Sequence, residues 1–189
     1  MKYQNIHQDL IDGCLNGDIK SQFKLYKLYY KAMFNTSLRI VNDKMVAEDI
    51  MQESFLSAFN KLKSYKGDVS FGAWLKKIVV NKSIDTIKKK NIIYSELDSS
   101  ITDNYSEVDE ENYDVSNEIK DKAEIIKNTI NQLPNGYRIV LSLNLLEGYD
   151  HDEIAQILNI TSSTSRSQFA RARKKLLQEL KLIQNYEKN

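Results

Sequence analysis

A short run near the end of the chain brings together side chains that could bind DNA. The run SSTSRSQFARARKKLLQEL, from Ser162 to Leu180, begins with hydroxyl groups and becomes strongly basic. Arginine can bind guanine through two hydrogen bonds, hydroxyls can bind base edges, and lysine is suited to phosphate. A solvated amphipathic helix would have a similar composition, so the run alone leaves both interpretations open. The residues expected on its outer face are Ser163, Thr164, Arg166, Ser167, Ala170 and Arg171, with Lys174 and Lys175 further along.

A second run interleaves aromatic rings with cations. Single-stranded DNA is bound in this way, because bases stack on rings while phosphates meet ammonium groups. Trp74 also fits a role as a core anchor, which is the commoner use of a large aromatic residue. The residues of this run are Phe71, Trp74, Lys76, Lys77, Asn81 and Lys82, followed by Lys88, Lys89 and Lys90.

A third group is acidic and polar. Asp49, Gln52 and Glu53 stand at positions i, i+3 and i+4, so they share one face of a predicted helix. Without further information, this is a solvated helix face. A catalytic carboxylate pair is poorly supported, because no histidine or nucleophile is near in the sequence and a solvated face is not a cleft.

The segment before the basic run predicts a helix-turn-helix. Gly148 stands where a helix should end, and Asp150 or Asp152 can cap the next one. Asn159 fits the tight turn, since it tolerates the left-handed conformation, and the Thr161 hydroxyl can cap the last helix. A short helix, a brief turn and a longer helix follow in this order. The expected inner stripe of the last helix is Phe169, Ala172, Leu176 and Leu180.

Helical spacing recurs along the rest of the chain and strand-like alternation is rare, so the predicted fold class is all-α. One stripe predicted to lie in the core consists of Phe23, Tyr26, Tyr30 and Phe34. Residues 94–118 are acidic, rich in Ser, Asn and Asp, and nearly free of large aliphatics. Such a segment is typical of a flexible linker. We therefore expect two small helical domains, 1–93 and 122–185, joined by an acidic linker over 94–121.

The net charge of +1 conceals two basic blocks around an acidic one. Residues 20–94 have 15 Lys and Arg against 6 Asp and Glu, residues 95–125 have 2 against 11, and residues 126–189 have 9 against 6. Charge blocks of this kind concern binding partners and not the fold. The acidic linker is either a plain solvated tether or a mask for a basic DNA-binding face.

The composition excludes several classes of protein. With 41% hydrophobic and 28% charged residues, the chain is a soluble globular protein, and it has no apolar run near the ~18 residues of a membrane span. The N-terminus lacks the pattern of a signal peptide. Cys14 is the only cysteine, so no internal disulfide can form, and one cysteine with two histidines makes a zinc site improbable. We expect no metal and no cofactor, and we expect His7 and His151 on the surface.

Three segments together carry a resemblance to a known family. They are AEDIMQESFLSAF, then YKGDVSFGAWLKKIVVNKSID, and finally LPNGYRIVLSL with LEGYDHDEIAQILNITSSTSRS and ARARKKL. In order and spacing they resemble the sigma-70 family of bacterial RNA polymerase sigma factors, in particular the small ECF (extracytoplasmic function) group. The resemblance covers both expected domains and nearly the whole chain outside the linker.

The resemblance implies a promoter-directing subunit without catalytic activity, located in the bacterial cytoplasm. Its first domain, region 2, would bind the β′ clamp helices of core RNA polymerase through Asp49, Gln52 and Glu53. Its second domain, region 4, would meet the β flap and read the −35 element through the outer face of the basic run. The group commonly has an anti-sigma factor as a further partner. The residues implied in capture and opening of the −10 element are Tyr65, Lys66, Ser70, Phe71, Trp74, Lys77 and Asn81.

Three residues depart from the family pattern. Ser165 stands where an apolar, core-facing residue is usual, so its hydroxyl must find a partner or cost about 1–3 kcal/mol. Gln168 replaces a frequent cation, and Ala170 offers a base only its methyl group. These changes affect the expected −35 sequence more than the activity. Two alternatives are a dimeric helix-turn-helix regulator, which would bind duplex unaided, and a nuclease, which would need a metal.

Overall fold

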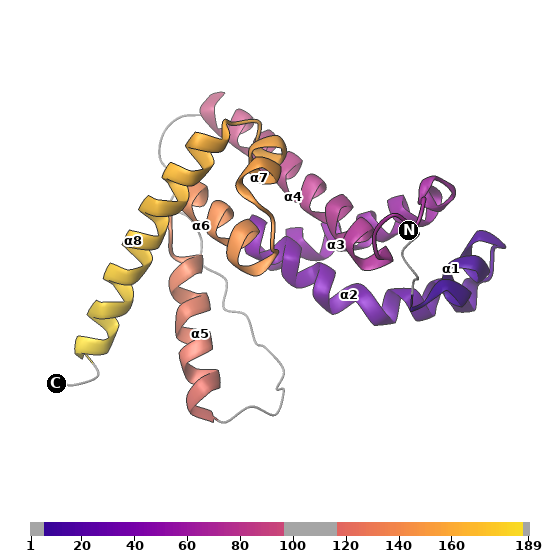
Figure 1. Cartoon of the computed structure of the whole chain (residues 1–189), viewed down its shortest axis with the longest axis horizontal. Helices are drawn as coiled ribbons and strands as arrows, with labels where there is room; N and C mark the ends of the chain where they lie inside the picture. Colours follow the sequence, from indigo (N-terminus) through magenta and orange to yellow (C-terminus); the bar gives the residue numbers. More distant parts are fainter. Residues whose placement is uncertain (1–5, 97–116, 187–189) are drawn as a thin grey trace. The chain divides into compact units, whose positions relative to one another are not determined.

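The computed structural model describes residues 6–96 and 117–186, and this part of the chain contains helices and no strand (Figure 1). The all-α prediction is therefore confirmed. The chain divides into two compact units, Met1–Ile101 and Thr102–Asn189.

The first unit is a small helical bundle. Asp18 caps the N-terminus of α2, where its carboxylate accepts from the backbone of Lys20 and Ser21 at 3.1 Å. Asp43 caps α3 through the backbone N–H of Val46. Helix α2 packs on α1, α3 and α4, and α3 packs on α4 (Figure 1). The elements are α1 (Gln8–Leu15), α2 (Ile19–Val41), α3 (Lys44–Asn60), the 3₁₀ turn η1 (Leu62–Ser64) and α4 (Phe71–Glu96).

One cluster of buried apolar residues holds this bundle together. It draws Leu25 from α2, Phe55 from α3 and Leu75 from α4. Tyr26, Tyr30 and Phe34 pack against this cluster, as predicted. The prediction that Phe23 belongs to the core is wrong, because its side chain is 58% exposed.

In the second unit, the local signals read from the sequence form the expected helix ends. Asp150 caps α7, accepting from the backbone N–H groups of Asp152 and Glu153 at 2.8 Å, and the Glu153 carboxylate accepts from the Asp150 N–H at 2.9 Å. Asn159 has the predicted left-handed conformation, with φ of 58°. The Thr161 hydroxyl accepts from the backbone of Thr164 at 3.0 Å and caps α8. The elements are α5 (Asn117–Asn131), α6 (Asn135–Leu141), the π-helix η2 (Ser142–Leu146), α7 (His151–Leu158) and α8 (Ser162–Tyr186).

The predicted inner stripe of α8 is confirmed. Ala172 and Leu176 are buried in a cluster with Leu133 and Leu141, while Phe169 and Leu180 pack against it. Helix α4 extends to Glu96 and α5 begins at Asn117, so both helices enter the segment 94–121 that we expected to be linker. Residues 97–116 of that expected linker lie outside the described residues.

Candidate functional site

The outer edge of α8 is the first candidate contact surface. Ser163, Arg166 and Ser167 are exposed in its first two turns, and Thr164 is half-buried. Because a helix N-terminus carries a partial positive charge, this end suits a phosphate backbone even before its arginines are counted. The exposed residues further along are Ala170, Arg171, Lys174 and Lys175.

Some of these polar groups already have partners within the chain. The Thr164 hydroxyl lies 2.8 Å from that of Thr161, and the Ser167 hydroxyl donates to the Thr164 carbonyl at 2.9 Å. Lys175 pairs with Glu179 at 3.3 Å on the same helix. Within the described ranges, no acidic side chain pairs with Arg166 or Arg171. These two guanidinium groups are therefore open to DNA, and so is the exposed Lys174 further along the helix.

Directly beneath this edge lies a contact that sequence reasoning missed. Ser165 is fully buried, and its Oγ lies 2.9 Å from Nδ1 of His151. The His151 ring is half-buried and meets the ring of Phe169 edge-on at 5.5 Å. His151 was expected on the surface, and this holds only in part, because its half-buried ring packs against Ser165 and Phe169 of α8. The signal was present in the sequence, since a buried hydroxyl at position 165 needs a partner.

In the first unit, the loop between η1 and α4 is the second candidate surface. The Tyr65 hydroxyl donates to the Val69 carbonyl at 2.5 Å and closes the loop that carries Lys66. Gly67 has φ of 74°, a conformation that favours glycine. The Ser70 hydroxyl accepts from the backbone N–H of Ala73 at 3.2 Å and so stabilises the start of α4.

The aromatic residues of this region form one group. Tyr65 lies 5.1 Å from Trp74 and 6.0 Å from Phe71, between ring centroids. Phe71 is only 1% exposed, so its ring lies in the core and is not open to a base. The expectation that Phe71 itself contacts DNA therefore does not fit the structure, and Phe71 instead supports its two half-buried neighbours. Trp74 shares one face of α4 with the exposed Lys77 and Asn81, at positions i, i+3 and i+7.

Helix α3 carries the third candidate surface. Asp49 and Gln52 are exposed, and Gln52 donates to the Glu48 carboxylate at 3.4 Å. Met45 is 80% exposed and Leu56 is 65% exposed. With Asp49 and Gln52, they stand at positions i, i+4, i+7 and i+11, so the four share one stripe. Sequence reasoning missed Met45 and Leu56, which add apolar area to a polar face and favour protein docking.

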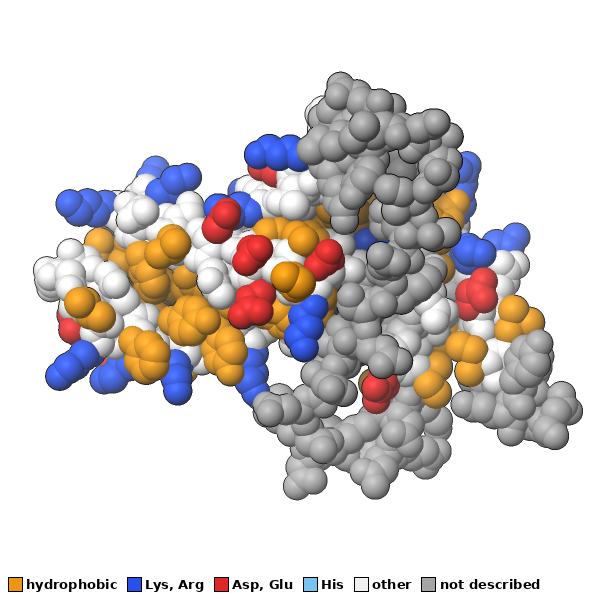
Figure 2. Space-filling model, turned by 180° about the vertical axis from the view of Figure 1, so that it is seen from behind, with side chains coloured by type: hydrophobic (Ala, Val, Ile, Leu, Met, Phe, Trp, Pro, Cys, Tyr) orange, Lys and Arg blue, Asp and Glu red, His pale blue; other side chains and the backbone are white. Residues whose placement is uncertain are grey.

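Figure 2 shows acidic side chains grouped beside exposed hydrophobic ones on one face of the molecule. Such a mixed surface differs from the basic edge of α8 and is suited to a protein partner.

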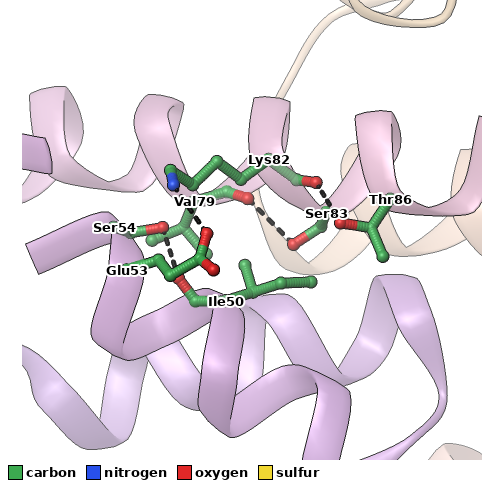
Figure 3. Close-up of polar contacts among 7 residues, drawn as sticks. All are labelled: Ile50, Glu53, Ser54, Val79, Lys82, Ser83 and Thr86. Carbon is green, nitrogen blue, oxygen red and sulfur yellow. Dashed lines mark hydrogen bonds and ion pairs between the residues drawn. The ribbon is translucent and has the colours of Figure 1, made fainter. Parts of the chain in front are cut away.

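Glu53 lies at the border between α3 and α4 (Figure 3). Its carboxylate pairs with Lys82 Nζ at 2.9 Å. Beneath this pair, the Ser54 and Ser83 hydroxyls donate to carbonyls of their own helices at 2.6 and 2.8 Å. These small side chains let α3 and α4 approach closely. Glu53 therefore belongs partly to the helix packing, whereas Asp49 faces solvent.

Two ionisable groups near the start of the chain have shifted pKa values. Burial, and then the charge of Asp18, raises the pKa of the Cys14 thiol. The hydrogen bond from the Ser21 hydroxyl lowers the pKa of Asp18. A thiol held protonated in this way is unsuited to a redox switch.

In residues 6–96 and 117–186, no three His, Cys, Asp or Glu side chains gather where a metal ion could be held. Nor is any helix in those ranges long and apolar enough to cross a membrane.

The fold and the surfaces define a class of protein. The second unit contains a helix-turn-helix with an exposed basic edge, and the first unit carries exposed lysines beside half-buried aromatic side chains. This combination defines a two-unit DNA-binding protein. Residues 25–92 match the family Sigma-70 region 2, and residues 123–176 match Sigma-70, region 4.

Relatives along the whole chain agree with this match. The chain is 30% identical over 182 residues to the ECF RNA polymerase sigma-E factor of Escherichia coli, covering 92% of this chain and 93% of the relative. It is 28% identical over 185 residues to the protein of the same name from Haemophilus influenzae, covering 92% and 94%. The chain belongs to the sigma-70 family, in its ECF group. It is a transcription initiation factor that directs RNA polymerase to promoters.

Solved structures share the fold. One is the sigma factor RpoE in complex with the anti-sigma factor NepR from Bartonella quintana, with a TM-score of 0.62, 20% identity, and coverage of 86% of this chain and 98% of that one. Another is CnrH in complex with the cytosolic domain of CnrY, with a TM-score of 0.55, 19% identity, and coverage of 93% and 97%.

Proposed function

We propose that this sigma factor divides its work between its two units, with each unit making a separate contact with promoter DNA. The second unit reads the duplex −35 element with the outer edge of α8. Arg166 and Arg171 bind base edges or phosphates, Ser163 and Ser167 add hydrogen bonds, and Lys174 anchors the backbone. The observation that carries this assignment is the pair of open guanidinium groups at the N-terminal end of a capped helix.

The first unit captures the −10 element as melted single strand. Opening the duplex costs a few kcal/mol for each unstacked base. The half-buried rings of Tyr65 and Trp74 can receive an unstacked base, while Lys66 and Lys77 neutralise the phosphates nearby. Ser70 and Asn81 supply hydrogen-bonding groups on the same side of the loop and helix.

The exposed stripe of α3 binds core RNA polymerase, with the β′ clamp helices as its partner. Asp49 and Gln52 supply the polar contacts, Met45 and Leu56 the apolar ones, and Glu53 contributes from the border with α4. The second unit also meets the β flap. Core binding then brings both DNA contacts together, and the segment between the units raises their combined affinity through effective concentration.

The remaining features follow from this assignment. The chain acts in the bacterial cytoplasm, where its polymerase is, and has no catalytic activity of its own. One solved neighbour, RpoE, is in complex with the anti-sigma factor NepR, which supports the proposal that this chain also has an anti-sigma factor.

Run-off transcription tests the proposal. Purified chain is added to core RNA polymerase on a pool of genomic promoter fragments, and the transcripts are sequenced. We expect transcripts from start sites that core polymerase alone does not use. We also expect the chain without polymerase to bind promoter duplex only weakly. Tight duplex binding by a dimer of the chain, without any gain in start-site selection, would support a repressor instead.

A further inference from the structure

We propose that His151 is a positioning residue for promoter recognition: through Ser165, it fixes the recognition helix α8 against α7 and so sets where the reading side chains stand. The proposal rests on the proposed role of α8 in reading the −35 element. It assigns a role to a residue that packs against α8 beneath the reading side chains.

The anchoring end of this contact lies at a capped helix start. His151 is the first residue of α7, directly after Asp150, whose reciprocal bonds with Glu153 fix the start of that helix. The capping bonds therefore fix the backbone position from which the His151 side chain contacts α8. A hydrogen bond from a fixed point restricts the partner helix more than one from a mobile side chain would.

The bond from Ser165 crosses between helices. Most buried hydroxyls in helices satisfy themselves on their own helix, as Ser54 does with the Ile50 carbonyl and Thr129 with the Ile125 carbonyl. Ser165 instead pairs with His151, 14 positions earlier in the chain. Because the bond joins two helices, its length depends on the position and rotation of α8.

Two further contacts secure the same end of α8. The His151 ring meets Phe169 edge-on, one turn further along the helix. The Ser162 hydroxyl, at the first position of α8, contacts the Asp152 carboxylate. The three contacts span the turns that carry Arg166 and Ser167, so a shift of α8 would break them together.

Ser165 stands between Thr164 and Arg166, and its inward bond therefore sets the outward direction of its neighbours. A serine hydroxyl can donate or accept, so the contact forms with either tautomer of His151. The pair is a geometric constraint that does not depend on the protonation state of the imidazole.

The test uses holoenzyme assembled with core polymerase and four variants of the chain: Ser165→Ala, His151→Ala, the double variant, and His151→Asn, whose amide can replace Nδ1 but not the ring. Two readouts are compared for each. One is transcription from a library of promoters with randomised −35 sequences. The other is binding to a single-stranded oligonucleotide that carries the −10 element, which does not involve α8.

We expect each single alanine variant to lose roughly fivefold in transcription from preferred −35 sequences, because a buried partner is left unpaired and the helix shifts. Base preference at the −35 positions should flatten, and binding to the −10 oligonucleotide should stay constant. The double variant should lose no more transcription than the more impaired of the two single variants, because both substitutions remove the same contact. His151→Asn should recover to within about twofold of the wild type if the hydrogen bond is the main constraint.

Equal losses in both readouts, additive effects, or an unchanged base preference would each overturn the proposal, since a merely structural role predicts them. If Ser165→Ala unfolds the second unit, His151→Ala and His151→Asn still test the proposal. Ser54→Ala removes a buried hydroxyl of the first unit and should leave −35 base preference unchanged. Arg166→Ala distinguishes failure of this proposal from failure of the proposed function. If Arg166→Ala also leaves the −35 base preference unchanged, the proposed reading role of α8 is wrong, and the result does not count against His151.

Discussion

The Glu53 carboxylate and the Lys82 ammonium group meet at 2.9 Å and join α3 to α4. The Glu53 side chain is 67% exposed, so water screens the pair, and we expect it to contribute only about 0.2–1 kcal/mol. Glu53→Gln should lower the free energy of unfolding by that amount, and exchanging the charges, Glu53→Lys with Lys82→Glu, should recover most of it. Urea denaturation of the wild type and of these two variants measures the free energies of unfolding. A loss well above 1 kcal/mol would mean that the pair is more buried in solution.

The exposed apolar residues of α3 give a second prediction. Met45→Ser and Leu56→Ser should each weaken binding to core polymerase by about tenfold, because apolar side chains at the centre of an interface carry much of its energy. The melting temperature should hardly change, since both side chains are exposed. Fluorescence titration of labelled chain with core polymerase gives the affinities.

Leu28→Ser provides the matched control for α3. Leu28 is 52% exposed and belongs to a different helix, α2. Its replacement should leave core affinity unchanged. If Leu28→Ser weakens binding as much as the α3 variants, the docking face has been assigned to the wrong helix.

A third prediction concerns Arg166. Its guanidinium is exposed and has no acidic partner among the described residues, so Arg166→Ala should weaken promoters with a fixed −35 element by roughly 1–3 kcal/mol. Lys181→Ala, about 22 Å further along α8, is the control and should have little effect. Competition between matched and altered −35 sequences measures both variants. If the two substitutions have equal effects, Arg166 contributes only electrostatic attraction to DNA and does not recognise bases.

How far the sequence could predict these features depends on how local their causes are. The caps at Asp150 and Thr161 and the turn at Asn159 involve neighbours a few residues away. The sequence predicted the Thr161 cap and the Asn159 turn, and it named Asp150 as one of two possible caps. The family resemblance also predicted two helical units, as the structure has them. The exposure of Phe23 depends on which helices cover α2, which periodicity alone does not contain.

Contacts between distant residues were beyond the sequence patterns. The periodic pattern of α4 did not distinguish the buried Phe71 from the half-buried Trp74, because only the packing of Tyr29 and Tyr65 on Phe71 decides between them. His151 looked like a surface residue because its partners, Ser165 and Phe169, lie on another helix. The need of the buried Ser165 for a partner could be stated from the sequence, but its identity required the fold.

A fourth prediction concerns the close approach of α4 to α2. A Cβ atom at Gly72 would lie 2.8 Å from Cε1 of Tyr29, whose ring packs on Phe71. Gly72→Ala should therefore force this ring to move and lower the free energy of unfolding by about 1–3 kcal/mol. Thermal unfolding measures the change.

Gly136→Ala is the matched control for this substitution. Gly136 lies in α6, and a Cβ there meets nothing within 4 Å. Alanine is the better helix former by up to about 1 kcal/mol, so this variant should be neutral or stabilised. A destabilised Gly136→Ala would show that the open space around α6 is filled in solution.

The last prediction separates the loop from the rings in −10 capture. The Tyr65 hydroxyl donates to the Val69 carbonyl and holds the loop that carries Lys66, while its ring lies beside Trp74. Tyr65→Phe removes only the hydrogen bond, worth about 0.5–1.5 kcal/mol, and leaves the stacking surface in place. Tyr65→Ala removes both the hydrogen bond and the ring, and it should cost a further about 1–3 kcal/mol for each base that stacks there.

Two measurements distinguish these effects. Holoenzyme binding to single-stranded −10 oligonucleotides measures the contribution of base stacking, and permanganate reactivity of promoter duplex measures strand opening. If the ring receives a base, Tyr65→Phe should slow opening while retaining most of the single-strand affinity, and Tyr65→Ala should lose both. Equal single-strand affinity in the two variants would mean that Tyr65 only shapes the loop, and that the base is held by Trp74 or by another residue of α4.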